Sequence, residues 1–411
     1  MFLAGDCMKD YKLHTTEGFK DSFGIEMLVK KEIERRIIDL YCSYGYELIK
    51  TPTVEFIDVY STNGMQKPDL YNLINRQGEV LSLCNDMTSS IARFVCSNYE
   101  NGIYKYCYSA DVFRYPKQYQ GKEHQFLQAG IEFIGQKGIS TDTEVIYLAY
   151  KSLKKCNVNE LTIHIGSALF LEKLFNDFKI DNNTKKIIYE CIETKDYVRL
   201  YNFLNLNLDN DKANFIYDLM LRGGKLNYID NLINNLNGEA VVELEYLKSI
   251  YLRLFNLGVD NVIFDFSIYS YARYYTGVVF SLYVPGISKA VVEGGRCDCL
   301  FKTFGHDFAN VGFGLDINSL TNYSLINKTI TLKNERYLSF VSDYSYVFAN
   351  ANNDIIREKG IIVNSLDFNS LNEALAYAKK HCYSKLLHYK NNSIEVMEVE
   401  LCWLLRYLKE G

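Results

Sequence analysis

The sequence has little proline and tryptophan, no paired-cysteine motif and no long apolar run. It contains only 4 Pro and 1 Trp. Its 11 Cys include no Cys-x-x-Cys pair, and Cys297-x-Cys299 is too closely spaced for a usual zinc site. No apolar run approaches the roughly 20 residues that span a bilayer, and no signal peptide opens the chain. We therefore expect reduced thiols, no metal site, no membrane segment and a cytoplasmic location.

Size and charge indicate a soluble globular protein and argue against nucleic-acid binding. A chain of 411 residues, with 48% hydrophobic and 23% charged residues, is typical of a soluble globular protein with two or three domains. The net charge is −5. Binding to a phosphate backbone needs clustered Lys and Arg, so this balance argues against nucleic acid as a partner.

The hydrophobic pattern predicts an α+β fold. Apolar residues at helical spacing predict a helix over 24–44, and Thr141-x-x-Glu144 has the form of a capping box before a helix over 145–153. Strands are predicted over 46–49, 80–83, 104–113, 123–134, 161–165, 262–269, 278–284, 290–293 and 309–315. We expect these strands to form one antiparallel sheet flanked by helices.

Two further segments differ from this pattern. Residues 168–258 show helical spacing with Asn-rich turns and no strand signal, which predicts a helical insertion. Beyond about 327–335 the pattern alternates between strand and helix, which is typical of a small α/β domain. The predicted domains are therefore 1–326, including the insertion, and 335–411.

The most informative stretch is FRYPKQYQGKEHQFLQAGIEFIG, which runs from Phe113 to Gly135. Gln128 and Glu132 are four residues apart on a predicted strand, so their side chains share one face. On a buried face this pair needs a ligand or protein partners, although a solvated sheet edge is the alternative. The stretch resembles the loop of histidyl-type class II aminoacyl-tRNA synthetases that binds ATP and the amino acid. The resemblance implies that Arg114, Gln128 and Glu132 contact the ligand.

Further motifs follow in the order expected of that family. In LSLCNDMTSSIAR, the resemblance places Asp86 at the α-ammonium of a bound amino acid and Thr88 beside it. The local alternative is that Asp86 or Thr88 caps the helix ahead. In SIYSYARYYTGVVF, Tyr274 and Tyr275 match a tyrosine pair that bounds the histidine pocket, with sheet packing as the alternative. Glu293-Gly294-Gly295-Arg296 resembles the family's Gly-Gly-Arg turn.

The residues expected to act on ATP are altered. Four positions where a synthetase of this type has arginine carry other residues, namely Lys122, His124, Ser270 and Ser319. Lys lacks the planar fork of Arg, and His is mostly neutral at pH 7. Arg273 lies near the position of an expected aspartate, and Glu123 adds negative charge where phosphates would lie. No cofactor is therefore expected.

Retention of the amino-acid positions and loss of the ATP positions is similar to the regulatory subunits of ATP phosphoribosyltransferase. The resemblance implies a non-catalytic protein that activates a short catalytic subunit, binds histidine as a ligand and helps transmit inhibition by it. It also implies a homodimer within a hetero-oligomer, with residues 24–44 and the segment to Pro52 and Glu55 in the dimer interface. Two alternatives stay open, namely an active histidyl-tRNA synthetase and a free-standing histidine-sensing or RNA-binding paralogue.

Overall fold

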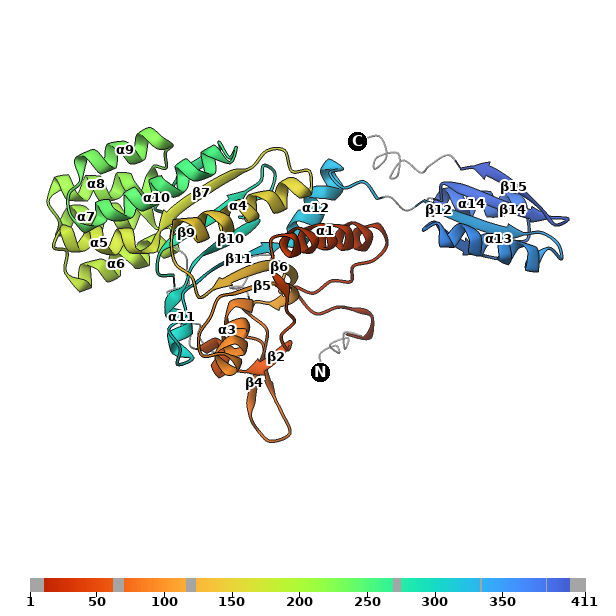
Figure 1. The fold of residues 1–411 in the computed structure, drawn as a ribbon, viewed down its shortest axis with the longest axis horizontal. Helices are drawn as coiled ribbons and strands as arrows, with labels where there is room; N and C mark the ends of the chain where they lie inside the picture. Colours follow the sequence, from red (N-terminus) through yellow and green to blue (C-terminus); the bar gives the residue numbers. More distant parts are fainter. Residues whose placement is uncertain are drawn as a thin grey trace, which may run out of the picture. The chain divides into compact units, whose positions relative to one another are not determined.

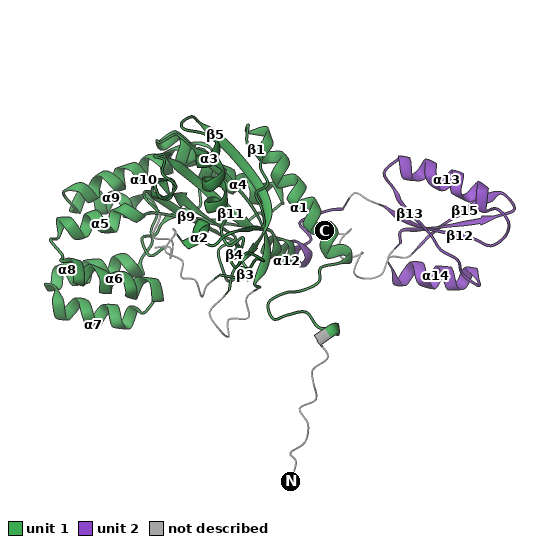
Figure 2. Ribbon diagram, turned by 90° about the horizontal axis from the view of Figure 1, so that it is seen from below, with its two compact units in different colours: residues 1–323 green, residues 324–411 purple. Residues whose placement is uncertain are grey.

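The computed structural model describes most of the chain and divides it into two compact units, residues 1–323 and 324–411. Figure 2 distinguishes the two units by colour. The described residues are 11–61, 70–115, 123–268, 275–332, 335–381 and 383–399. The predicted site positions Lys122, Ser270, Arg273 and Tyr274 lie outside these ranges.

An eight-stranded sheet forms the centre of the first unit (Figure 1). In spatial order its strands are β1 (Glu47–Leu48), β5 (Tyr104–Phe113), β6 (Gln125–Ile134), β11 (Asn310–Asp316), β10 (Val292–Arg296), β9 (Val278–Tyr283), β7 (Thr162–Ser167) and β8 (Val262–Phe264). The inner pairs are antiparallel, as predicted, but the edge pairs β1–β5 and β7–β8 are parallel. The sheet is therefore mixed.

Helices α1 (Gly24–Ser43) and α4 (Ile139–Lys155) pack on one face of this sheet. Tyr41 of α1 lies edge-on to Phe313 of β11, with the ring centroids 5.8 Å apart. The predicted capping box was wrong, because α4 begins at Ile139 and its N-cap is Gly138. Glu144 instead forms an ion pair of 2.7 Å with Lys105 on β5.

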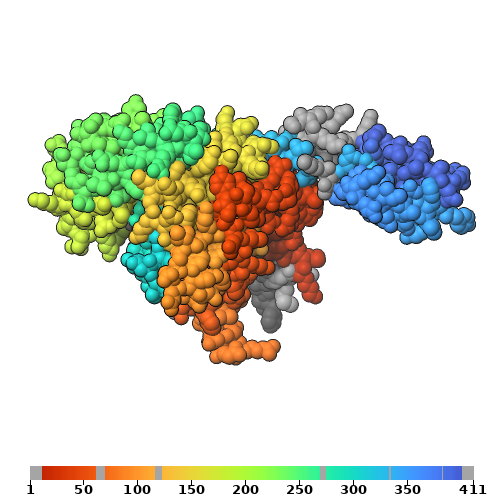
Figure 3. All heavy atoms as spheres, in the orientation of Figure 1, coloured from red at the N-terminus to blue at the C-terminus, as the bar shows by residue number. Residues whose placement is uncertain are grey.

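The opposite face is covered at its β5 end by a smaller layer. It contains β2 (Val54–Phe56), α2 (Asp58–Ser61), β3 (Asn72–Ile74), β4 (Val80–Leu83), α3 (Met87–Asn98) and α11 (Asp298–Thr303), and the short helix η1 (Tyr11–Leu13) precedes α1 in the chain. Strands β2, β4 and β3 form a separate sheet, and the β3–β4 hairpin projects from the unit (Figure 3). Apolar residues of α3 and α11, including Ile91 and Phe301, form one buried cluster with Tyr108 of β5.

The helical insertion follows β7. Its helices are α5 (Ala168–Asp177), α6 (Asn182–Thr194), α7 (Tyr197–Asn207), α8 (Asn210–Leu221), α9 (Leu226–Asn235) and α10 (Glu239–Asn256). The side chains of Asp181, Asp196 and Asp209 cap α6, α7 and α8, which explains why these Asn-rich segments start new helices. Helix α10 then returns along α5 and α4 to the sheet.

The second unit is a small α/β structure. The unit boundary lies within α12 (Ile317–Asn327). The later elements are β12 (Arg336–Val341), α13 (Tyr346–Glu358), β13 (Ile362–Ser365), α14 (Leu371–Lys380), β14 (Lys385–Lys390) and β15 (Ser393–Glu398). The strand order is β13-β12-β14-β15, with α13 and α14 on opposite faces of the sheet (Figure 2). Strand β15, which sequence analysis missed, pairs antiparallel with β14.

Candidate amino-acid pocket

Two glycines of the neighbouring strand β11 leave room for Gln128 and Glu132 on the face of the sheet that lies away from α1 and α4. Glu132 pairs with Gly312 of β11, and Gly314 lies one pleat further along that strand. A Cβ atom at Gly312 would overlap the Glu132 carboxylate, and one at Gly314 would overlap the Gln128 amide. Both polar side chains are buried, with Glu132 only 2% exposed. The solvated-edge alternative is therefore wrong for this pair.

Two donors hold the Glu132 carboxylate. Thr88 Oγ1 donates to Oε1 at 2.6 Å, and Asn310 Nδ2 donates to Oε2 at 2.7 Å. Burial raises the pKa of Glu132 to about 7, with these two hydrogen bonds opposing the rise and nearby Asp86 adding to it. Among the described residues, no cation forms an ion pair with this carboxylate. It therefore gains and loses its proton near neutral pH.

Gln128 is held from the neighbouring strand. The Tyr108 hydroxyl donates to Gln128 Oε1 at 3.0 Å. Burial raises the pKa of Tyr108 well above its usual value, so this phenol keeps its proton and remains a donor. The bond fixes the Gln128 amide with its oxygen toward β5.

Asp86 acts as the N-cap of α3. Its carboxylate accepts from the backbone N–H of Thr88 at 3.2 Å and of Ser89 at 3.3 Å, and from Ser89 Oγ at 2.7 Å. The capping interpretation is therefore confirmed for Asp86. Asp86 also lies close enough to raise the pKa of Glu132. The Asp86 carboxylate therefore caps α3 and belongs to the pocket as well.

Tyr275 closes another side of the group. A Cβ atom at Gly295 would lie 2.9 Å from the Tyr275 ring, so the ring covers this glycine of β10. Burial raises the pKa of Tyr275 well above its usual value, with Cys297, Asp86 and Glu132 among the nearby groups that add to the rise. The structure therefore brings together Asp86, Thr88, Gln128, Glu132 and Tyr275.

Arg114 lies outside this group. Its side chain is exposed, its Nε donates to the Asn85 carbonyl at 3.4 Å, and its guanidinium lies 5.3 Å from the centroid of the Phe126 ring. Lys289 lies 5.9 Å from the same ring and forms an ion pair of 2.6 Å with Asp316. Arg114 is thus a rim residue, unlike the other predicted site residues in the described ranges.

Two described residues, His124 and Ser319, lie where the family has arginines. Both make contacts within the protein. His124 is buried, its Nδ1 contacts the Tyr71 hydroxyl, and its backbone N–H donates to the Gly18 carbonyl at 2.8 Å. Phe19 lies edge-on to the His124 ring, with centroids 6.0 Å apart. Ser319 donates through its backbone N–H and hydroxyl to Asp316, at 2.9 and 2.8 Å. These positions offer no cation for a phosphate.

Arg296, in the glycine motif, is a structural residue. It pairs with Asp142 of α4 and, at 3.1 Å, with Asp298. Asp142 also accepts from the Tyr246 hydroxyl of α10 at 2.7 Å. Arg296 is only 6% exposed, so its charge is satisfied internally and ties β10 to α4 and the insertion.

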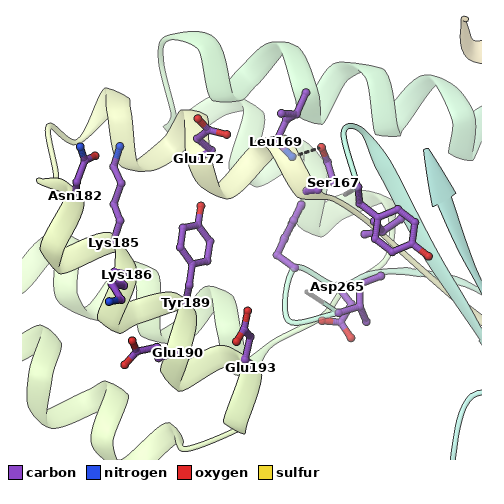
Figure 4. A pocket seen from close by; sticks show the side chains of 15 residues that line it. Ser167, Leu169, Glu172, Asn182, Lys185, Lys186, Tyr189, Glu190, Glu193 and Asp265 are labelled. Atoms are coloured by element: carbon purple, nitrogen blue, oxygen red, sulfur yellow. Dashed lines mark hydrogen bonds between the residues drawn. The ribbon is translucent and has the colours of Figure 1, made fainter. Parts of the chain in front are cut away.

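A hollow of about 470 Å³ lies between the sheet and the insertion (Figure 4). Glu172 of α5, Lys185, Tyr189 and Glu190 of α6, and Asp265 line it, and Tyr275 borders it as well. Sequence analysis missed these residues, because a shared cavity between helices and a loop leaves no local pattern.

No group of three or more His, Cys, Asp or Glu in the described ranges is arranged to hold a metal ion. Among the residues that the structure describes, no helix is long and apolar enough to cross a membrane.

Comparisons with known proteins agree with this architecture. Residues 18–320 match the family model of histidyl-tRNA synthetase. A Clostridium kluyveri protein named ATP phosphoribosyltransferase regulatory subunit is 30% identical over 90% of this chain and 97% of its own length. One of the same name from Thermoanaerobacter pseudethanolicus is 28% identical, over 94% of this chain and 100% of its length.

Solved structures share the fold. A regulatory subunit/histidyl-tRNA synthetase from Bacillus halodurans has a TM-score of 0.80 at 24% identity, over 92% of this chain and 99% of that one. Histidyl-tRNA synthetase from Nostoc sp. PCC 7120 has a TM-score of 0.78 at 19% identity, over 97% and 100% of the two chains. The chain belongs to the histidyl-tRNA synthetase family and, within it, to the ATP phosphoribosyltransferase regulatory subunits.

Proposed function

We propose that this chain is a non-catalytic subunit of histidine biosynthesis that activates a short ATP phosphoribosyltransferase catalytic subunit and makes it sensitive to histidine. The names of its relatives support the regulatory role and imply a partner enzyme. The observation that carries the proposal is the contrast between the two halves of the synthetase-like site. The amino-acid half keeps its buried acceptors, and two described positions of the ATP half, His124 and Ser319, carry no arginine.

The amino-acid half suits a ligand with several N–H donors. Glu132, Gln128 and Asp86 supply carboxylate and amide groups, and Tyr275 supplies an aromatic wall. Histidine carries an ammonium group and an imidazole, which match these acceptors. We therefore propose Asp86, Thr88, Gln128, Glu132 and Tyr275 as the histidine contacts, with Arg114 at the rim and Tyr274 beside them in the chain.

The ATP half is unsuited to aminoacyl transfer. Stabilising the charge on a transferring carboxylate and phosphate contributes several kcal/mol in such reactions, and it requires fixed cations. His124 is enclosed by the arm at Gly18 and by Tyr71, and Ser319 is bonded to Asp316. Lys122 and Ser270 carry the other two sequence changes. These features favour a regulatory function over an active synthetase.

The test is formation of phosphoribosyl-ATP by the same organism's short catalytic subunit. We expect activity to rise when this chain is added and to fall again with histidine, with a coupling free energy of about 1–3 kcal/mol. Co-elution of the two proteins would measure their association, and the mass of the isolated chain would test the proposed homodimer.

Variants separate activation from histidine control. Glu132→Ala should keep activation and lose inhibition by histidine, because it removes the central acceptor of the pocket. Glu245→Ala, at an exposed position on α10, is the matched control and should behave like the wild type. Absence of activation would refute the proposed role. Histidine-dependent ATP–pyrophosphate exchange would instead establish the active-synthetase alternative.

A further inference from the structure

Asn310, the first residue of β11, is a buried polar residue that sequence analysis did not select. Its exposure is 0%, and it shares a sheet face with Glu132. Its Nδ2 donates to Glu132 Oε2 at 2.7 Å and contacts Cys297 Sγ at 3.0 Å. Gly312 of β11 lies opposite Glu132 of β6 and has no side chain to block this contact.

The chemistry of the two groups fixes the direction of the Asn310 amide. An ionised carboxylate only accepts hydrogen bonds, so the NH₂ group must face Glu132. The Asn310 Oδ1 atom is fully buried and has no hydrogen-bond partner among the described residues. A buried amide oxygen without a hydrogen bond lowers the stability of the folded protein. This cost points to a hydrogen-bond donor that a bound ligand supplies.

The main chain of Asn310 connects the pocket to the buried ion network. Its N–H donates to Asp298 Oδ1 at 2.9 Å, and its carbonyl accepts from the Cys297 N–H at 2.8 Å. Asp298 pairs with Arg296, which pairs with Asp142 of α4. The main chain of Asn310 is therefore anchored to Asp298 and Cys297, which makes this residue a rigid support for Glu132.

We propose that Asn310 is a positioning residue of the pocket, holding the Glu132 carboxylate ionised and aimed at an N–H donor of a bound imidazole ligand. This inference rests on the proposed function, because it takes histidine as the ligand of this pocket. The Asn310 amide oxygen supplies a second acceptor beside the carboxylate. No relative's name and no motif in the sequence identifies this residue.

The electrostatic surroundings of Glu132 make this support necessary. The titratable groups near it are Asp86 at the start of α3, Tyr46 before β1, Tyr108 on β5, Tyr275 before β9 and Cys297 after β10. None of these is a cation, and burial disfavours the ionised carboxylate. The Thr88 and Asn310 donors are the groups that stabilise its charge.

Histidine affinity should therefore depend on pH in a way that Asn310 controls. In the wild type, affinity should rise with pH as Glu132 loses its proton, around the value of about 7 to which burial raises its pKa. Removing the Asn310 donor would raise the pKa of Glu132 further, because one bond to the charged form is lost. The rise in affinity would then move to higher pH.

The experiment is calorimetric titration of histidine into the full-length chain over a series of pH values. Asn310→Ala should weaken binding about tenfold or more at neutral pH, as expected for a lost bond to a charged group, and should shift the profile to higher pH. Asn310→Asp keeps the shape but sets a second carboxylate against Glu132, so it should weaken binding further. Asn353→Ala, at a buried asparagine of the second unit, is the matched control.

The possible outcomes are distinguishable. A shifted pH profile in both Asn310 variants, with Asn353→Ala unchanged, is the expected result. Wild-type affinity and profile in Asn310→Asp would overturn the inference and leave the proposed function standing. Equal weakening at every pH, in parallel with lost thermal stability, would show a merely structural role and overturn it too. No histidine binding by the wild type would overturn both this inference and the histidine part of the proposed function.

Discussion

Replacing Glu132 with Gln should stabilise the ligand-free protein at alkaline pH, although it removes a buried, hydrogen-bonded side chain. The neutral amide retains the shape of the carboxylate. Its oxygen can accept from Asn310 Nδ2, and its NH₂ can donate to Thr88 Oγ1, because the hydroxyl can rotate. The substitution therefore removes the buried charge and keeps both contacts.

The magnitude follows from the pKa of Glu132. Burial raises it from 4.5 to about 7. Each pKa unit corresponds to about 1.4 kcal/mol, so ionising Glu132 in the folded state costs about 3 kcal/mol. The folded protein keeps a proton that the unfolded chain releases between about pH 4.5 and about pH 7. The stability of the wild type therefore falls with rising pH across this window and remains lower above it.

Urea denaturation of both proteins, followed by circular dichroism, measures this effect. The stability of Glu132→Gln relative to the wild type should increase by about 2–3 kcal/mol between about pH 4.5 and about pH 8. Glu55→Gln is the control, because Glu55 is buried but paired with Arg93 at 2.9 Å, so its substitution should destabilise. A difference between Glu132→Gln and the wild type that is the same at both pH values would refute the reasoning.

Two other substitutions and an ATP titration test the remaining features. Gly314→Ala should displace the Gln128 amide and weaken histidine binding about tenfold in calorimetry, with little loss of stability, because the added methyl meets only the end of a flexible side chain. Unaltered affinity would contradict this. Arg296→Met should lower the free energy of unfolding by about 3–5 kcal/mol, since it leaves Asp142 buried without its partner. A loss below about 1 kcal/mol would disprove the structural role. The isolated chain should show no micromolar ATP binding in calorimetry, because His124 and Ser319 supply no phosphate cation; tight binding would disprove this.

The sequence predicted the α+β fold and the main strands because their signals are local. The expected strand over 104–113 is β5, and the spacing of Gln128 and Glu132 placed both on one face of β6. Apolar residues such as Val29, Ile33 and Ile37 recur on the buried face of α1. These features depend on periodicity within one element, which a single sequence records directly.

The errors and omissions concern contacts between distant segments. Glu144 matched a capping motif, but Lys105 on another strand pairs with it. The parallel pairing of β1 with β5 and of β7 with β8 depends on crossovers, which have no local signal. Asn310 belongs to the pocket only because β11 lies beside β6.

The energetic cost of the pocket is itself an argument for a ligand. Folding alone would favour an apolar side chain at a position where burial raises the pKa of a carboxyl to about 7. Glu132 is nevertheless held by two donors, Thr88 and Asn310, and it faces Gly312, which leaves room for its carboxylate. A ligand that brings an N–H donor or a positive charge would favour the ionised form and stabilise the folded state in proportion to its affinity. Histidine binding should therefore release a proton near neutral pH, and heats of binding measured in buffers of different ionisation enthalpy would detect it.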